Sequence, residues 1–191
     1  MIDFAITIQG TAPLLMHSSR LSDPLDPATK ELKKLSSKRT KTDDDHAAVS
    51  EAEFRGSLYH DIHVGPYIPG ENVMASLVSA AKLNKMGVKV TRGLFIKSDV
   101  NPIAYNGPRD IDGLWNQGWK HRASVKVGTS RVIRTRPIFF EWVTEAQGVL
   151  DESQLDLADL TVIAENAGAF IGLGDWRPRF GRFTATVERI K

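Results

Sequence analysis

A glycine-rich segment between a predicted helix and a predicted strand constrains this chain more than any other feature. The twelve residues from Gly172 to Phe183 contain three glycines, three arginines and three aromatic residues. Glycine allows positive φ angles and close approach of another chain, arginine pairs with phosphate, and aromatic rings stack on bases. A loop of this composition is typical of a site for single-stranded nucleic acid, a polyanion with exposed aromatic faces.

The hydrophobic periodicity predicts two strand–helix–strand units. Apolar residues recur at helical spacing over residues 73–83 and 157–171, and Asp156 is placed to cap the second of these helices. The strand-like segments are residues 2–9, 93–96, 123–127, 130–144 and 183–190. We therefore expect an α+β fold of the ferredoxin-like or RRM-like kind, a four-stranded antiparallel sheet with two helices on one face. The other face would be free for a ligand.

Two segments interrupt this order and are predicted to be insertions in a single domain of residues 1–191. Residues of about 17–56 are polar and have few large apolar side chains, so we expect a large, partly mobile insertion that projects from the sheet, with short helices near residues 27–35 and 45–53. Residues 98–119 are rich in Pro, Gly and Asn and are expected to form a long loop. Pro137 predicts an edge, bulge or bend within its strand.

Basic residues are concentrated in the middle of the chain, although the formal net charge is only +2. No acidic residue occurs from Gly113 to Phe140, and Arg134 and Arg136 share strand parity. We expect a row of arginines that follows phosphates across the open face of the sheet; a solvated charged strand is the alternative. The candidate nucleic-acid-binding residues are Lys120, His121, Arg122, Lys126, Arg131, Arg134, Arg136, Gly172, Gly174, Trp176, Arg177, Arg179 and Arg182. Trp176 either stacks on a base or closes the loop, and Trp119 and Tyr105 are further stacking candidates.

Two motifs resemble those of the RAMP superfamily, the repeat-associated proteins of CRISPR systems. Gly172, Gly174, Gly181 and Phe183 resemble its glycine-rich loop, although Phe183 stands where the usual pattern has a glycine. The turn from Ile68 to Asn72 resembles the Pro-Gly turn that leads into the first RAMP helix. The chain is most similar to CRISPR effector backbone subunits and to phage-encoded stand-alone single-stranded DNA-binding relatives. The resemblance implies a nucleic-acid groove and assembly as a homo-oligomer or filament.

The expected function is therefore non-catalytic binding of single-stranded DNA, or alternatively RNA, with weak sequence preference and without a cofactor or metal. One alternative is a metal-independent RAMP-type endoribonuclease that uses His60 or His63, since histidine suits acid–base catalysis near neutral pH. The other is a phage structural or regulatory protein that uses the fold for protein contacts. A dinucleotide loop is excluded because the glycines follow a helix and precede a strand.

The compartment is expected to be the cytoplasm of a bacterial or phage-infected host cell. No segment has the run of about 20 apolar residues that spans a bilayer, and the first residues do not form a signal peptide. The chain has no cysteine, which excludes disulfides and thiolate metal sites. We therefore expect a soluble protein with no membrane partner.

Overall fold

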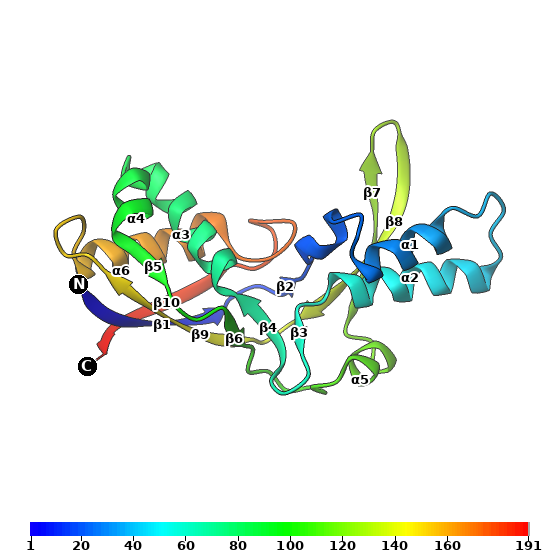
Figure 1. Cartoon of the computed structure of the whole chain (residues 1–191), viewed down its shortest axis with the longest axis horizontal. Helices are drawn as coiled ribbons and strands as arrows, with labels where there is room; N and C mark the ends of the chain where they lie inside the picture. The colour runs from blue at the N-terminus through cyan, green and yellow to red at the C-terminus, as the bar shows by residue number, and fades with distance from the viewer. Residues whose placement is uncertain (191) are drawn as a thin grey trace.

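The computed structural model describes residues 1–190 and shows an elongated α+β molecule with an antiparallel four-stranded sheet at one end (Figure 1). The strands lie in the order β10 (Phe183–Ile190), β1 (Ile2–Gly10), β9 (Val143–Leu150) and β5 (Leu94–Ile96). In the register of this sheet, Ile6 of β1 pairs with Val187 on one side and Ala146 on the other. The strands expected at residues 2–9, 93–96 and 183–190 are confirmed.

Three helices lie on one face of the sheet (Figure 1). They are α3 (Gly70–Leu83), α4 (Gly87–Gly93) and α6 (Leu157–Asn166), and α6 continues into a π-helical turn, η2 (Ala167–Ile171). The predicted cap is confirmed, because the Asp156 side chain accepts a hydrogen bond from the backbone N–H of Asp159. Phe4, Ile6 and Ile8 of β1 are fully buried under these helices, as their alternation predicts.

Residues 17–56, the expected insertion, form a helical arm at the opposite end of the molecule (Figure 1). The arm consists of η1 (Ser19–Ser22), α1 (Pro27–Ser36) and α2 (Asp43–Ser57). Its few large apolar residues do not form a separate core. Instead Phe54 of α2 is fully buried in the same hydrophobic cluster as Ile6 and Leu77.

The prediction of a long loop at residues 98–119 is wrong. This segment holds β6 (Val100–Pro102) and α5 (Ile111–Asn116), and β6 joins β4 (Gly65–Pro69) and β3 (His60–Asp61) in a second sheet. The Asn101 side chain donates a hydrogen bond of 2.9 Å to the Ile68 carbonyl, and Leu114 is fully buried. Long-range anchors of this kind outweigh the local turn preference of Pro, Gly and Asn.

The basic middle of the chain does not join the main sheet. The strands β7 (Lys120–Val127) and β8 (Ser130–Phe139) form a hairpin that projects from the molecule, and β2 (Leu14–Leu15) completes this third sheet (Figure 1). The expected strand over residues 130–144 is therefore two strands, β8 and the start of β9. Pro137 marks a changeover, since β8 pairs with β7 up to Pro137 and with β2 from Ile138.

Candidate nucleic-acid interface

The glycine-rich loop is held tightly against the protein's own backbone. Gly172, Gly174 and Gly181 adopt φ angles of +79°, +77° and +71°, which side chains disfavour. A Cβ atom at Gly174 would overlap the carbonyl oxygen of Leu15. The N–H of Asp175 donates to that same oxygen at 2.8 Å. The close approach of another chain segment, which the glycines predict, is thus made by the backbone of β2. The glycines therefore shape the loop, and the space left by their missing side chains is not used to contact a ligand.

The glycine-rich loop meets the base of the hairpin. The ring centroid of His121 lies 5.6 Å from that of Trp176 and 5.4 Å from that of Phe180. The guanidinium of Arg136 donates to the Asp175 carboxylate at 3.0 Å. We call these five residues the loop–hairpin junction. The junction brings together segments that lie about 40 to 60 residues apart in the sequence.

Trp176 sits in a strained conformation at this junction. Its φ angle is +51°, a value rare for a residue with a side chain. Its ring is edge-on to His121 and only partly buried. Trp176 therefore helps to close the loop onto the hairpin while part of the ring remains exposed. Strain of this kind persists where the surrounding structure enforces it, and it is common at functional sites.

The prediction that Arg136 belongs to a row of arginines on an open face is wrong, because Arg136 is only 7% exposed. Its guanidinium lies 2.9 Å from the carboxylate of Glu53, a residue of α2 that is itself buried, and Arg134 pairs with the same carboxylate at 3.1 Å. Glu53 also accepts the backbone N–H of Thr135 at 2.8 Å. These two arginines join the arm to the hairpin. Glu53 lies some 80 residues away in the sequence, so no local pattern predicts this role.

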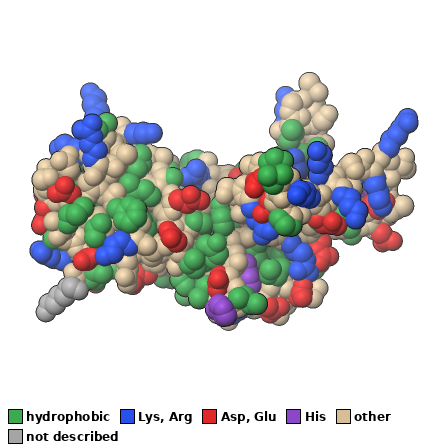
Figure 2. All heavy atoms as spheres, in the orientation of Figure 1, with side chains coloured by type: hydrophobic (Ala, Val, Ile, Leu, Met, Phe, Trp, Pro, Cys, Tyr) green, Lys and Arg blue, Asp and Glu red, His purple; other side chains and the backbone are tan. Residues whose placement is uncertain are grey.

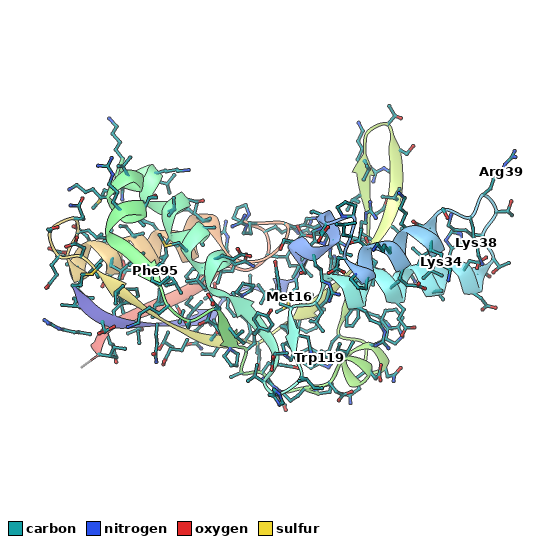
Figure 3. All side chains as sticks on the ribbon, viewed as in Figure 1. Met16, Lys34, Lys38, Arg39, Phe95 and Trp119 are labelled. Carbon is teal, nitrogen blue, oxygen red and sulfur yellow. The ribbon has the colours of Figure 1, made fainter. Side chains whose placement is uncertain are left out.

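Lys120 and the central aromatic residues are also engaged within the protein. The ammonium group of Lys120 lies 3.6 Å from the ring centroid of Trp115. Trp119 packs against Tyr105, with ring centroids 5.1 Å apart, at the base of the hairpin (Figure 3). Both rings are partly buried against the core. These two candidate stacking residues therefore have a packing role in this structure.

Six of the candidate residues are exposed cations, and none of them has an ion-pair partner within residues 1–190. They are Arg122, Lys126 and Arg131 on the hairpin and Arg177, Arg179 and Arg182 on the loop. Lys126 and Arg131 face each other directly across the two strands. Like charges in this position repel and destabilise a hairpin, and a bound anion would relieve the repulsion.

A groove of about 590 Å³ runs between the hairpin and the arm, and we call it the arm groove. Arg122 and Arg131 line one side, and Lys41, Asp43 and His46 line the other, with the buried Glu53 between the arm and the hairpin. Beyond it, the basic tip of the arm carries Lys34, Lys38 and Arg39 (Figure 3). Figure 2 shows Lys and Arg side chains over the arm and near the foot of the hairpin. Sequence reasoning missed Lys41 and His46, although the short basic run at residues 38–41 is a signal that could have pointed to them.

The open face of the main sheet is a poor surface for phosphate. It exposes Glu145 and Glu188, and Asp3 on the same face pairs with Lys97. The basic strands that were expected to supply this face with arginines belong to the hairpin instead. Acidic side chains repel a phosphate backbone, so the electrostatics favour the loop and the hairpin over the sheet.

The histidines of the ribonuclease alternative lie in β3 and in the turn that follows it. His60 Nε2 lies 2.8 Å from the backbone carbonyl of Arg109. His63 is exposed in a turn where its backbone N–H donates to Asp61. The three aspartates at residues 43–45 occupy the first turn of α2, where Asp45 completes a capping box. Within the described residues, no three His, Asp or Glu side chains are grouped to hold a metal.

No protein-family model and no curated protein matches this chain. In the part of the chain that the structure describes, no helix has both the length and the apolar composition to cross a membrane.

Proposed function

We propose that this protein binds single-stranded nucleic acid along the glycine-rich loop and the β7–β8 hairpin. The main support for this proposal is the loop–hairpin junction, which brings two segments together. Each of these segments has three exposed cations. Cations of this kind supply the salt-dependent part of binding to a phosphate backbone. Partly exposed aromatic rings such as Trp176 can stack on bases of any sequence. The expected binding has weak sequence preference, and single-stranded DNA is the preferred ligand, with RNA as the alternative.

The main sheet with α3 and α6 is proposed to be a ferredoxin-like core of the RAMP kind. The strand order β10–β1–β9–β5, with all neighbours antiparallel, supports this assignment. The helical arm and the projecting hairpin would then be elaborations of that core. A strand-binding protein of this class would act in the cytoplasm of a bacterial or phage-infected cell.

The proposed activity is binding without catalysis. His60 Nε2 is hydrogen-bonded to the backbone carbonyl of Arg109, and His63 lies in an exposed turn. Neither residue lines the arm groove. An RNA strand bound to the protein is therefore expected to remain intact.

Fluorescence anisotropy with labelled oligothymidine, and with an RNA of equal length, tests the proposal. We expect binding that weakens strongly between about 50 mM and about 200 mM salt, with unlabelled duplex competing less well than single strand. A gel of the recovered strands should show no cleavage. Absence of binding at low salt and micromolar protein would refute the proposal, and cleavage lost in His60→Ala or His63→Ala would favour the ribonuclease.

Assembly along the strand is part of the proposal. An elongated subunit with an arm at one end and a sheet at the other (Figure 1) suits head-to-tail stacking along a linear polymer. Light scattering on complexes with short and long oligothymidines should show a mass that rises stepwise with strand length. A constant stoichiometry of one protein per strand at every length would argue against a filament.

A further inference from the structure

A cleft of about 250 Å³ lies at the centre of the molecule, beside the glycine-rich loop. The loop contributes Gly174 and Arg177 to its walls, and the remaining walls come from residues 14–19, Tyr59, β4 and the first turns of α3. Met16, which lies between the two ends of the molecule in Figure 3, is one of its apolar lining residues. Sites for drug-sized ligands usually occupy about 300–1,000 Å³, so this cleft suits a smaller group.

Two tyrosines give the cleft an aromatic wall. The rings of Tyr59 and Tyr67 lie 5.9 Å apart between centroids and are tilted by 55°. The hydroxyl of Tyr59 accepts the backbone N–H of Ser19 at 3.2 Å, which holds this ring in position. Neither ring is fully buried. Because both rings line the cleft and are partly exposed, part of their aromatic surface is available to a flat ligand.

Polar groups around this wall can recognise the edge of such a ligand. The side-chain amide of Asn72 makes no hydrogen bond to any other group of residues 1–190, and it offers both donors and an acceptor. His17 also lines the cleft, with Nδ1 3.4 Å from the Ser57 hydroxyl. Desolvation, followed by the charge of Arg136, lowers the pKa of His17. Arg177 at the rim is exposed and can meet a phosphate.

We propose that this cleft takes one unstacked base of the bound strand, between the tyrosine wall and the glycine-rich loop. The inference rests on the proposed function, because the strand must first follow the loop. The aromatic surface, the uncommitted amide and the exposed arginine match three features of a nucleotide, which are the flat face of the base, the polar edge of the base and the phosphate. A base of a single strand can enter such a site at little cost in free energy, since that base is already unpaired.

The test compares two strands with the same number of phosphates, oligothymidine and an abasic oligomer, by fluorescence anisotropy. Tyr67→Leu is expected to weaken oligothymidine binding by about tenfold and to leave binding of the abasic strand unchanged. Tyr67→Phe, which keeps the ring, should bind like the wild type. Equal weakening for both strands, or no weakening for either, would overturn the inference. Wild-type protein that binds neither strand would instead refute the proposed function.

A second variant guards against misfolding of Tyr67→Leu. Asn72→Ala removes a partly exposed side chain without a hydrogen-bond partner in the described chain, so the fold should be preserved, as a circular dichroism melt can verify. It should weaken oligothymidine binding severalfold and again spare the abasic strand. Unchanged oligothymidine binding in a folded Asn72→Ala would also contradict the inference.

Discussion

At the scale of single residues, the glycine-rich loop depends on backbone contacts that exclude a side chain. Gly174→Ala would force a Cβ against the carbonyl of Leu15 at a φ of +77°. We expect the free energy of unfolding to fall by about 3 kcal/mol or more, from the left-handed conformation together with the overlap. Gly128 is the matched control, because its φ is +60° and nothing lies near a Cβ there. Gly128→Ala should cost about 1–2 kcal/mol, and urea unfolding measures both; equal losses would contradict the role given to Leu15.

The buried carboxylate of Glu53 is the second residue on which the structure depends. It neutralises Arg134 and Arg136 and accepts the N–H of Thr135. Glu53→Gln should lower the free energy of unfolding by about 3–5 kcal/mol, since it leaves a buried guanidinium short of negative charge. Glu51→Gln, on the same helix, removes only a partly exposed pair with Arg55 and should cost under about 1 kcal/mol. Thermal or urea denaturation that found the two variants equal would show that Glu53 does not join arm and hairpin as described.

At the scale of elements, the start of α2 depends on one ionised carboxyl. The side chain of Lys38, followed by the backbone N–H of Thr42, holds the pKa of Asp45 at about 2, below its ordinary value of 3.8. A lowered pKa means that the ionised form favours the folded arm. The stabilisation is therefore complete above about pH 4 and is lost as the pH falls through about 2. Carboxyl titration by NMR should show this value, and titration near 3.8 would mean that the Lys38 contact and the capping box are absent in solution.

The hairpin supplies three of the six exposed cations that are proposed to contact phosphate. Arg122→Ser with Arg131→Ser should weaken oligothymidine binding and reduce the salt slope of log K by about 1.4, because each contact on a single strand contributes about 0.7. The control pair is Lys89→Ser with Arg92→Ser, two exposed cations on α4 that lie outside the proposed path. Anisotropy titrations across a salt series measure both slopes. If both pairs of substitutions reduced the salt slope equally, the hairpin would contribute only general electrostatic attraction.

At the scale of the whole molecule, hydrophobic periodicity was enough to predict β1, β5 and β10 of the main sheet. Periodicity, together with the cap at Asp156, also predicted the helices α3 and α6. The alternation from Ile2 to Ile8 and the cap at Asp156 are local signals, and local chemistry decides those elements. The separation of β8 from β9 was not predictable, because it depends on β2 pairing with Ile138 from more than 100 residues away. The burial of Arg136 was missed for the same reason. The structure brings the glycine-rich loop and the basic strands together although these strands lie outside the main sheet. The Tyr59 and Tyr67 wall of the cleft was not predicted.

Photocrosslinking tests whether a single strand lies at the loop–hairpin junction. Oligothymidine with bromodeoxyuridine at successive positions would be bound, irradiated and digested, and the crosslinked residues identified by mass spectrometry. We predict crosslinks to Trp176, Phe180 and His121, the aromatic residues of the junction. Phe95 is the internal control, since it is 63% exposed on the open face of the main sheet. Crosslinks at Phe95 with none at the junction would contradict the account.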